Sequence, residues 1–392
     1  MHKEQITDHR SQITKLKVMT VVGTRPEIIR LSATIKLLDK YANQVFVHTG
    51  QNYDYELNEI FFEDLGLRKP DHFMNVDTSS LGAAIGDIFR KTEEILNLEK
   101  PDALLVLGDT NSCLSAYMAK RKHIPIFHME AGNRSFDFNV PEEINRRIID
   151  HIADFNLVYT EHARRHLISE GLQHRRIYLT GSPMWEVINQ NKEKIENSDI
   201  LKKINIEEKK YFVVSVHREE NVDNPDNLRQ VLNVLNNLAE KYQVPVIVST
   251  HPRTRKRIEM LAERTKSNFN ERIQFLKPFG FNDYVHLQMH ALCTISDSGT
   301  ISEESSMLSF PAISLRQSME RPEAQDSGTI ILTGFDSDVV LNSVQMSIEE
   351  QEINQYESIA MEYKINNTST RVVKLILGNT KLSNKWWGIN KV

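Results

Sequence analysis

The chain has 392 residues, 40% hydrophobic and 26% charged, which is the composition of an ordinary soluble protein and enough length for two compact domains. Its net charge of -5 argues against a general nucleic-acid or membrane-surface role. The two cysteines have no metal-like spacing, which fits a reducing cytoplasm and disfavours a disulfide scaffold or a zinc site.

Residues 1–15 are polar and predict a disordered or frayed extension rather than a signal peptide. No apolar run approaches the roughly 20 residues that a membrane-spanning helix needs. We therefore expect a cytoplasmic protein.

Short β-branched segments alternate with amphipathic stretches of helical length, which predicts α/β architecture with parallel sheets. A polar, charge-rich pause at 190–210 interrupts this pattern before it restarts. We expect two Rossmann-like domains facing each other across a cleft, residues 16–182 and 183–365, with a segment from about residue 366 to 392 packing back on the first. The expected strands are 18–22, 45–48, 103–107, 125–128, 157–159, 177–179, 212–216, 245–249, 273–276, 293–296 and 312–315.

The first motif, GTRPE at 23–27, follows the first expected strand and opens a helix. A helix N-terminus favours an anion, and Arg25 adds donors suited to phosphate. A plain strand-to-helix turn with an exposed arginine explains the motif equally well, because the three-glycine dinucleotide fingerprint is missing.

Three acidic residues stand at the boundaries of neighbouring elements. Asp109 and Glu130 each follow an apolar run, and Glu142 opens a helix marked by Pro141. Burying an unpaired charge is costly, so packing explains these residues poorly. Ligand sites of open α/β sheets lie at the carboxyl ends of strands, so converging carboxylates there indicate acid–base chemistry.

The second half carries cationic and small-residue motifs after its strands. His217 and Arg218 end one strand and suit a diphosphate or a proton transfer, although an exposed pair held by Glu219 and Glu220 is the simpler reading. Arg321, in the segment ERPE, suits phosphate or a salt bridge that closes the domain.

The segment DSGTISEE at 297–304 follows a strand and opens a helix. The backbone and hydroxyl groups of Ser298, Gly299 and Thr300 suit a phosphate. Glu304, one turn on, suits a sugar diol. An ordinary capping box is the alternative explanation.

In this order, the motifs GTRPE, GDT, HMEAG, VPEE, HREEN, SDSGTISEE and ERPE resemble the non-hydrolysing UDP-N-acetylglucosamine 2-epimerase family over nearly the whole chain. Segments 47–58, 107–113, 131–134, 140–150 and 296–306 look like the subgroup that makes UDP-N-acetyl-L-fucosamine. Enzymes of that subgroup act on UDP-2-acetamido-2,6-dideoxy-L-talose for capsules and O-antigens.

The resemblance implies a glycosyltransferase-B-like fold, UDP in the interdomain cleft, a homodimer, and neither a metal nor another cofactor. It assigns catalysis to Asp109, Glu130, Glu142 and His217. The UDP-binding positions that it implies are Arg25, Arg30, Tyr284, Ser298, Gly299, Thr300, Glu304 and Arg321.

Two departures from the family pattern fall on these positions. Thr300 replaces a second glycine of the phosphate loop, and Tyr284 replaces a phenylalanine near the uracil. Segments 51–54 and 76–80 depart from the pattern of the regulated members, so we do not expect activation by UDP-N-acetylglucosamine.

The reaction implied by the resemblance is loss of UDP from C1 with removal of the C2 proton, followed by re-addition with C2 inverted. Glu130 or Asp109 as base and Glu142 as acid is our hypothesis for the proton transfers. The alternative substrate is UDP-N-acetylglucosamine, giving UDP-N-acetylmannosamine. A UDP-sugar glycosyltransferase, a hydrolysing relative and a nucleotide-sugar sensor are the competing functions.

Overall fold

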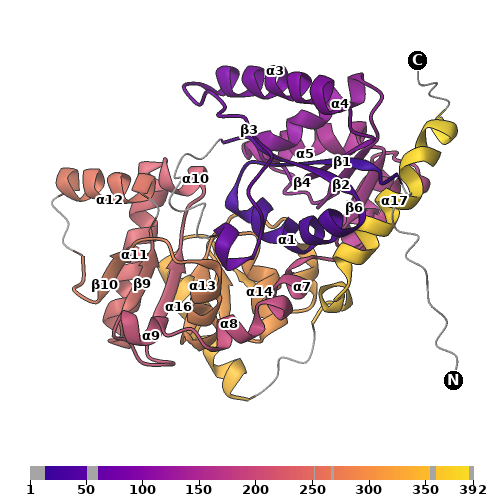
Figure 1. Cartoon of the computed structure of the whole chain (residues 1–392). Helices are drawn as coiled ribbons and strands as arrows, with labels where there is room; N and C mark the ends of the chain where they lie inside the picture. Colours follow the sequence, from indigo (N-terminus) through magenta and orange to yellow (C-terminus); the bar gives the residue numbers. More distant parts are fainter. Residues whose placement is uncertain (1–13, 51–60, 251, 266–268, 354–358, 388–392) are drawn as a thin grey trace, which may run out of the picture.

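The computed structural model describes residues 14–50, 61–250, 252–265, 269–353 and 359–387. Most of the expected N-terminal extension, and residues 51–58 of the subgroup segment 47–58, lie outside these ranges. Within them the chain forms two parallel sheets, each flanked by helices, which confirms the expected α/β architecture (Figure 1). We call the parts built on these sheets the first lobe and the second lobe.

The sheet of the first lobe is built from short apolar strands, and those between its two edge strands are buried along almost their whole length. Such strands suit a parallel sheet covered on both faces by helices. The strand order is β3-β2-β1-β4-β5-β6-β7. The bounds are Lys17–Val22 (β1), Asn43–His48 (β2), His72–Phe73 (β3), Ala103–Leu107 (β4), Ile126–Met129 (β5), Phe155–Val158 (β6) and Ile177–Leu179 (β7).

Helices connect these strands and then lead toward the second lobe. Prolines in the first turns of α1 and α5 start both helices at positions where a missing N–H costs no hydrogen bond. The bounds are Arg25–Tyr41 (α1), Leu81–Glu99 (α3), Asn111–Leu114 (η2), Ser115–Arg121 (α4), Pro141–Ile152 (α5), Glu161–Ser169 (α6), His174–Arg176 (η3), Met184–Gln190 (α7), Lys192–Glu196 (α8) and Ile200–Lys203 (α9).

The sheet of the second lobe has the order β10-β9-β8-β11-β12-β13. Its strands are Phe212–Ser215 (β8), Val246–Ser249 (β9), Ile273–Leu276 (β10), Cys293–Ser296 (β11), Ala312–Ser314 (β12) and Ile331–Leu332 (β13). The helices of this lobe are Glu219–Val222 (α10), Pro225–Tyr242 (α11), Pro252–Thr265 (α12), Phe281–His290 (α13), Ile301–Leu308 (α14), Pro322–Asp326 (α15) and Ser337–Glu352 (α16).

The chain returns to the first lobe through Met361–Lys364 (η4) and the long final helix Thr368–Trp387 (α17). Figure 1 shows α17 in yellow beside α1, and the two helices are in contact. Val372, Val373 and Ile376 join the hydrophobic core around α1, as do Phe281 and Met307 of the second lobe. The lobes therefore share apolar contacts as well as chain connections.

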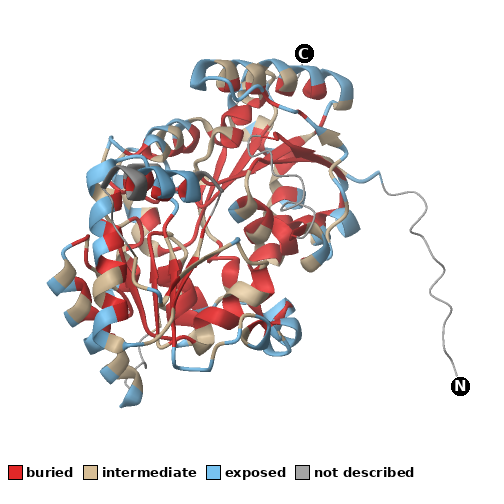
Figure 2. Cartoon of the chain, turned by 90° about the vertical axis from the view of Figure 1, so that its left-hand side faces the viewer, coloured by how far each residue is buried: buried red, intermediate tan, exposed pale blue. Residues whose placement is uncertain are grey.

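Figure 2 shows both sheets as buried layers, with the exposed residues on the outer faces of the helices. Two edge strands, β3 and β13, were not expected from the sequence, because a two-residue strand is too short to show a period. No helix in the described ranges is both long and apolar enough to cross a membrane.

Candidate active site

Asp109 and Glu130 lie side by side at the carboxyl edge of the first sheet. β4 and β5 are paired in parallel with Leu107 opposite Met129, so the residues that follow them are neighbours. Glu130 has a φ of +63°, a conformation that residues other than glycine seldom adopt and that often occurs at functional sites. Gly108 has a φ of +74°, and a Cβ there would lie 3.5 Å from Glu130 Oε2.

The Glu130 carboxylate is held between two arginines from different lobes. Oε2 accepts a hydrogen bond from Arg30 Nη1 of α1, and Oε1 lies 2.7 Å from Arg321 Nη2 of the second lobe. Arg321 also pairs with Glu303, which accepts a hydrogen bond from Ser182 Oγ at 2.7 Å. Burial opposes the charge of Arg321, but the carboxylates of Glu303 and Glu130 outweigh it and raise the pKa well above its ordinary value.

Asp109 is paired with a residue of α5. Arg146 Nη2 contacts Asp109 Oδ2 and lies 3.8 Å from Glu320 Oε2 of the second lobe. Burial lowers the pKa of Arg146 to about 10. Glu142 is half-buried one helical turn before Arg146, so both residues lie on the same side of α5.

Glu27 joins the first two motifs. Its Oε2 accepts hydrogen bonds from the Gly23 N–H at 3.0 Å and from the hydroxyls of Thr24 at 2.8 Å and Thr110 at 3.2 Å. The Ser112 hydroxyl donates to its other oxygen. Burial raises the pKa of Glu27, despite these hydrogen bonds. Glu27 thus fixes the turn that carries Arg25 against the turn that carries Asp109.

Arg25 stands at the first position of α1, beside Phe61. Its guanidinium carbon lies 5.6 Å from the centroid of the Phe61 ring. This places a cation at the carboxyl end of β1, next to the strand that leads to Asp109.

His217 follows β8 and is oriented by a buried carboxylate. Asp297 Oδ1 lies 3.0 Å from His217 Nδ1, and Asp297 also accepts hydrogen bonds from the backbone N–H groups of His217 and Arg218 and from Asn221 Nδ2. Burial alone would raise the pKa of Asp297, but His217 and these hydrogen bonds lower it to about 2. An ionised Asp297 on Nδ1 leaves Nε2 of the half-exposed imidazole facing away from it.

The segment Ser298–Thr300 connects β11 to α14. The Ser298 and Thr300 hydroxyls lie 2.8 Å apart, and the Thr300 N–H donates to Ser298 Oγ at 3.3 Å. A Cβ on Gly299 would lie 3.5 Å from Glu320 Oε2, 3.7 Å from Arg316 Nη1 and 3.8 Å from Arg321 Nε. Small residues here bring the backbone close to two guanidinium groups and to the carboxylate that pairs with Arg316.

Glu304 and Tyr284 lie beside this segment. Glu304 accepts a hydrogen bond from Gln288 Nε2 at 2.8 Å, and burial raises its pKa in spite of that bond. Tyr284 is half-buried on α13 and shares a hydrogen bond with Ser215; burial also raises its pKa. These positions surround the carboxyl end of β11.

Three arginines of the site share one carboxylate. Glu320 Oε1 lies 2.7 Å from Arg316 Nη2 and 3.3 Å from Arg218 Nη1, and Glu320 Oε2 lies 3.8 Å from Arg146 Nη2. Burial alone would raise the pKa of Glu320, but the surrounding arginines hold that pKa well below its ordinary range. Arginines gathered from both lobes suit an anionic ligand.

The structure therefore brings most of the expected residues to facing edges of the two sheets. Direct contacts link Arg30, Glu130 and Arg321, while His217 contacts Asp297 rather than the carboxylates of the first lobe. Residues that were not singled out from the sequence are Glu27, Arg146, Asp297, Glu303 and Arg316. Four of these five residues lie in or beside the quoted motifs, so the sequence could have indicated them. Arg316 lies in none of these motifs, and no sequence pattern pointed to it.

Within the described ranges, no group of three or more His, Cys, Asp or Glu side chains has the arrangement of a metal site.

Two Rossmann-like lobes, with carboxylates on one edge and an arginine-rich small-residue loop on the other, define a glycosyltransferase-B-like enzyme. The chain belongs to the UDP-N-acetylglucosamine 2-epimerase family, whose model matches residues 37–377. The protein is thus an isomerase of the non-hydrolysing type, as its sequence motifs predicted.

Relatives of known name support this assignment. The UDP-N-acetylglucosamine 2-epimerase of Methanococcus maripaludis is 36% identical over 338 residues, covering 85% of this chain and 92% of the relative. The solved structure of UDP-N-acetylglucosamine 2-epimerase from Rickettsia bellii is 47% identical with a TM-score of 0.87, covering 95% of this chain and 100% of that one. The Methanocaldococcus jannaschii UDP-GlcNAc 2-epimerase, solved in complex with UDP-GlcNAc and UDP, is 33% identical with a TM-score of 0.86, covering 92% and 99%.

Proposed function

We propose that the protein inverts C2 of UDP-2-acetamido-2,6-dideoxy-L-talose to give UDP-N-acetyl-L-fucosamine, for capsule or O-antigen synthesis. The observation that carries the reaction type is the ion pair between Glu130 and Arg321, which joins the carboxylate edge of the first lobe to the cationic loop region of the second. A proton-transfer group and a diphosphate-binding group meet there.

The proposed reaction proceeds by elimination and re-addition, because a C2 proton with no neighbouring carbonyl is only weakly acidic. The C1–O bond breaks and its electron pair leaves with UDP. A carboxylate removes the C2 proton, whose C–H electrons form the C1–C2 double bond of a 2-acetamidoglycal. A proton then adds to the other face of C2, and the UDP oxygen attacks C1.

The residue roles follow from this sequence of steps. Asp109 or Glu130 takes the proton, and Glu142 returns one to the opposite face. His217, oriented by Asp297, assists proton transfer near the leaving diphosphate. Arg25, Arg30 and Arg321 and the loop Ser298–Thr300 stabilise the charge on that leaving group, while Glu304 holds the ribose and Tyr284 the uracil.

Solvent exchange tests the reaction. Incubated in heavy water without any acceptor, the protein should incorporate deuterium at C2 of the UDP-sugar. In Asp109→Asn and Glu130→Gln proteins the rate should fall by roughly 10²-fold or more. A Glu94→Gln protein, altered on the exposed face of α3, is the matched control. Normal exchange in both active-site variants would contradict the assignment, and sugar transfer without exchange would indicate a glycosyltransferase.

Two observations support a 6-deoxy substrate. Segments 107–113, 131–134, 140–150 and 296–306, which resemble the fucosamine-forming subgroup, include Asp109, Glu142 and the loop Ser298–Thr300. Phe136 and Phe138, in the loop just before Glu142, expose apolar rings. A 6-deoxy sugar presents a methyl group where UDP-N-acetylglucosamine presents a hydroxymethyl group, and apolar rings favour the methyl.

UDP-N-acetylglucosamine is the alternative substrate, because the named relatives above carry that activity in their names. Measuring kcat/KM for both UDP-sugars on one preparation separates the two. We expect at least tenfold preference for the 6-deoxy-L-talose nucleotide, and the opposite preference would replace this proposal with the alternative.

We also propose that the protein is a cytoplasmic homodimer. Both cysteines are buried free thiols, which suits a reducing compartment. Tyr117, Ile144 and Ile148 expose apolar surface on the adjoining helices α4 and α5. Light scattering after size-exclusion chromatography should give twice the chain mass, and an Ile148→Asp protein should give the monomer mass.

A further inference from the structure

A basic cavity lies beside β7, an edge strand of the first sheet, and none of the proposed catalytic or UDP-binding residues lines it. It has a volume of about 610 Å³ and lies between η3, β7 and the first turns of α17, with a contribution from α6. Its lining includes Arg164, His174, Arg175, Arg371 and Lys374, and no acidic residue of the described chain lines it. Such a concentration of cationic groups is unexpected on a protein of net charge -5.

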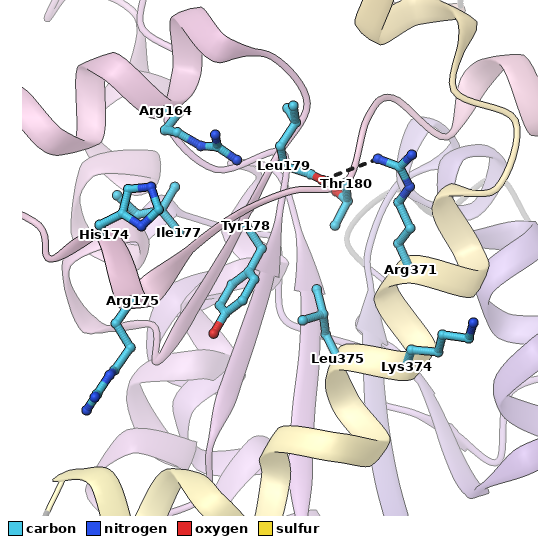
Figure 3. Close-up of a pocket in the computed structure, with 10 residues that line it drawn as sticks. All are labelled: Arg164, His174, Arg175, Ile177, Tyr178, Leu179, Thr180, Arg371, Lys374 and Leu375. Carbon is cyan, nitrogen blue, oxygen red and sulfur yellow. Dashed lines mark hydrogen bonds between the residues drawn. The ribbon is translucent and has the colours of Figure 1, made fainter.

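Two of the arginines are directed toward the same place. Figure 3 shows the guanidinium groups of Arg164 and Arg371 pointing toward the Leu179–Thr180 backbone from opposite sides, whereas Arg175 and Lys374 point away from that centre. Arg371 is held by two hydrogen bonds, from its Nε to Asn367 Oδ1 at 2.9 Å and from its Nη1 to the Leu179 carbonyl at 3.5 Å.

The cations of this cavity are only partly compensated. Arg164 Nη1 pairs with Glu161, but its Nε is buried without a hydrogen-bond partner in the described chain. Arg175 lies over the Trp386 ring at 5.5 Å, and neither it nor Arg371 forms an ion pair with a described carboxylate. Cationic groups gathered around one cavity, with Arg371 lacking a carboxylate partner in the described chain, indicate an anionic ligand.

The rest of the lining is apolar. Ile177, Tyr178, Leu179 and Leu375 contribute hydrocarbon or ring surface between the arginines. A cavity of this size suits a small molecule with an apolar or aromatic body and a few polar groups.

We propose that this cavity binds a phosphorylated small molecule with an aromatic body, such as a nucleotide, as a site separate from the catalytic one. Arg164 and Arg371 hold the phosphate groups, and the body lies against Tyr178 and Leu375. The chemistry requires a planar fork of donors on each side of the phosphate, which guanidinium groups supply.

Hydrogen bonds connect the wall of this cavity to the segments that join the two lobes. Thr180, in its wall, accepts a hydrogen bond through its carbonyl from Thr368 Oγ1 at 3.1 Å, and the same hydroxyl donates to the Ser182 carbonyl. These residues belong to the two segments that connect the lobes. Ser182 in turn bonds to Glu303, the partner of Arg321.

Tryptophan fluorescence tests the proposal next to the cavity, because Trp386 contacts the lining residue Arg175. In a protein with Trp185→Phe and Trp387→Phe, Trp386 beside Arg175 is the remaining reporter. Titration with ADP should give a saturating signal, and inorganic pyrophosphate should bind at least about tenfold more weakly, because it lacks the aromatic body.

Paired charge variants locate the binding. Arg164→Gln with Arg371→Gln should weaken ADP binding by at least about tenfold. Arg165→Gln with Lys381→Gln removes the same charge from exposed positions of the same two helices and should leave it unchanged. Melting of each protein without ligand checks that it is folded.

Three results would overturn the proposal: no saturable signal with either probe, equal loss of binding in both double variants, or a signal given by heparin alone. Equal affinity for ADP and pyrophosphate would show that the aromatic body does not contribute to binding, which would contradict that part of the proposal. Because the fluorescence signal is independent of turnover, none of these results bears on the epimerase reaction.

Discussion

Asp297 is the residue that determines how His217 can act. Its carboxylate is completely buried and contacts Nδ1 of the imidazole, so His217 carries its proton on that nitrogen when neutral. Replacing Asp297 by Asn removes the charge but keeps the shape. We expect kcat/KM to fall by roughly 10²-fold, because the imidazole loses the carboxylate that holds its Nδ1.

A double-mutant cycle separates this positioning role from a general structural one. If Asp297 acts through His217, then Asp297→Asn should cost little further activity in a His217→Asn protein. Equal fractional losses in both backgrounds would mean that Asp297 supports the loop rather than the imidazole.

The same carboxylate predicts a dependence of stability on pH. Asp297 has a folded-state pKa of about 2 against an ordinary value of 3.8. Because the folded value is depressed, its contribution is complete above about pH 4 and is lost as the pH falls through about 2. The contribution is about 2 kcal/mol.

Urea unfolding of the wild type and of Asp297→Asn at several pH values measures the contribution of this carboxylate to the free energy of unfolding. The free-energy difference between the two proteins should shrink between about pH 4 and pH 2. A difference that stays constant across this range would contradict the depressed pKa.

At the scale of the elements, Gly132 determines how β5 leads into the loop before α5. Its φ is +79°, and a Cβ there would lie 2.4 Å from the Ala163 carbonyl oxygen of α6. Because backbone cannot move aside as a flexible side chain can, Gly132→Ala should destabilise the protein by about 2 kcal/mol or more.

Gly86→Ala is the matched control, since Gly86 lies within α3 and a Cβ there meets nothing within 4 Å. That change should stabilise the protein by about 0.5–1 kcal/mol through helix propensity. Thermal melting of both variants measures the pair, and equal effects of the two changes would contradict the steric argument.

The elements also show what the sequence could predict and what it could not. Strands such as β1 and β4 were predictable, because their apolar runs are bounded by motifs. The edge strands β3 and β13 were not, because they are held by pairing with a neighbour rather than by a local pattern. The subgroup segment at 51–58 lies outside the described residues.

The site divides in the same way. The positions of Asp109 and Ser298 just beyond strand ends were predictable, and parallel sheets place their ligands at such ends, but the roles of these residues stay predictions. The partners of these residues were not, because pairing depends on side-chain direction across the fold. Arg146 meets Asp109 from another element, and Arg321 reaches Glu130 from the other lobe, 191 positions along the chain.

At the scale of the whole molecule, a chain of polar contacts connects the lobes through the site. Ser182 of the connecting segment bonds to Glu303 on α14, Glu303 pairs with Arg321, and Arg321 pairs with Glu130 of the first lobe. Glu303 is fully buried, so its charge depends on partners such as Arg321 and Ser182.

Glu303→Gln tests whether this connection holds the lobes together. The amide is isosteric but removes the charge that neutralises buried Arg321, so we expect a loss of about 3 kcal/mol in the free energy of unfolding. Of the two carboxylates that pair with Arg321, only Glu130 keeps its charge in this variant. We expect the stronger pairing to hold Glu130 away from proton transfer, so that kcat falls by a larger factor than KM rises. Glu193→Gln, an exposed change on α8, is the control. Differential scanning calorimetry and steady-state kinetics measure the two effects, and an unchanged melting temperature with unchanged kcat would show that the lobes are held by their shared apolar core alone.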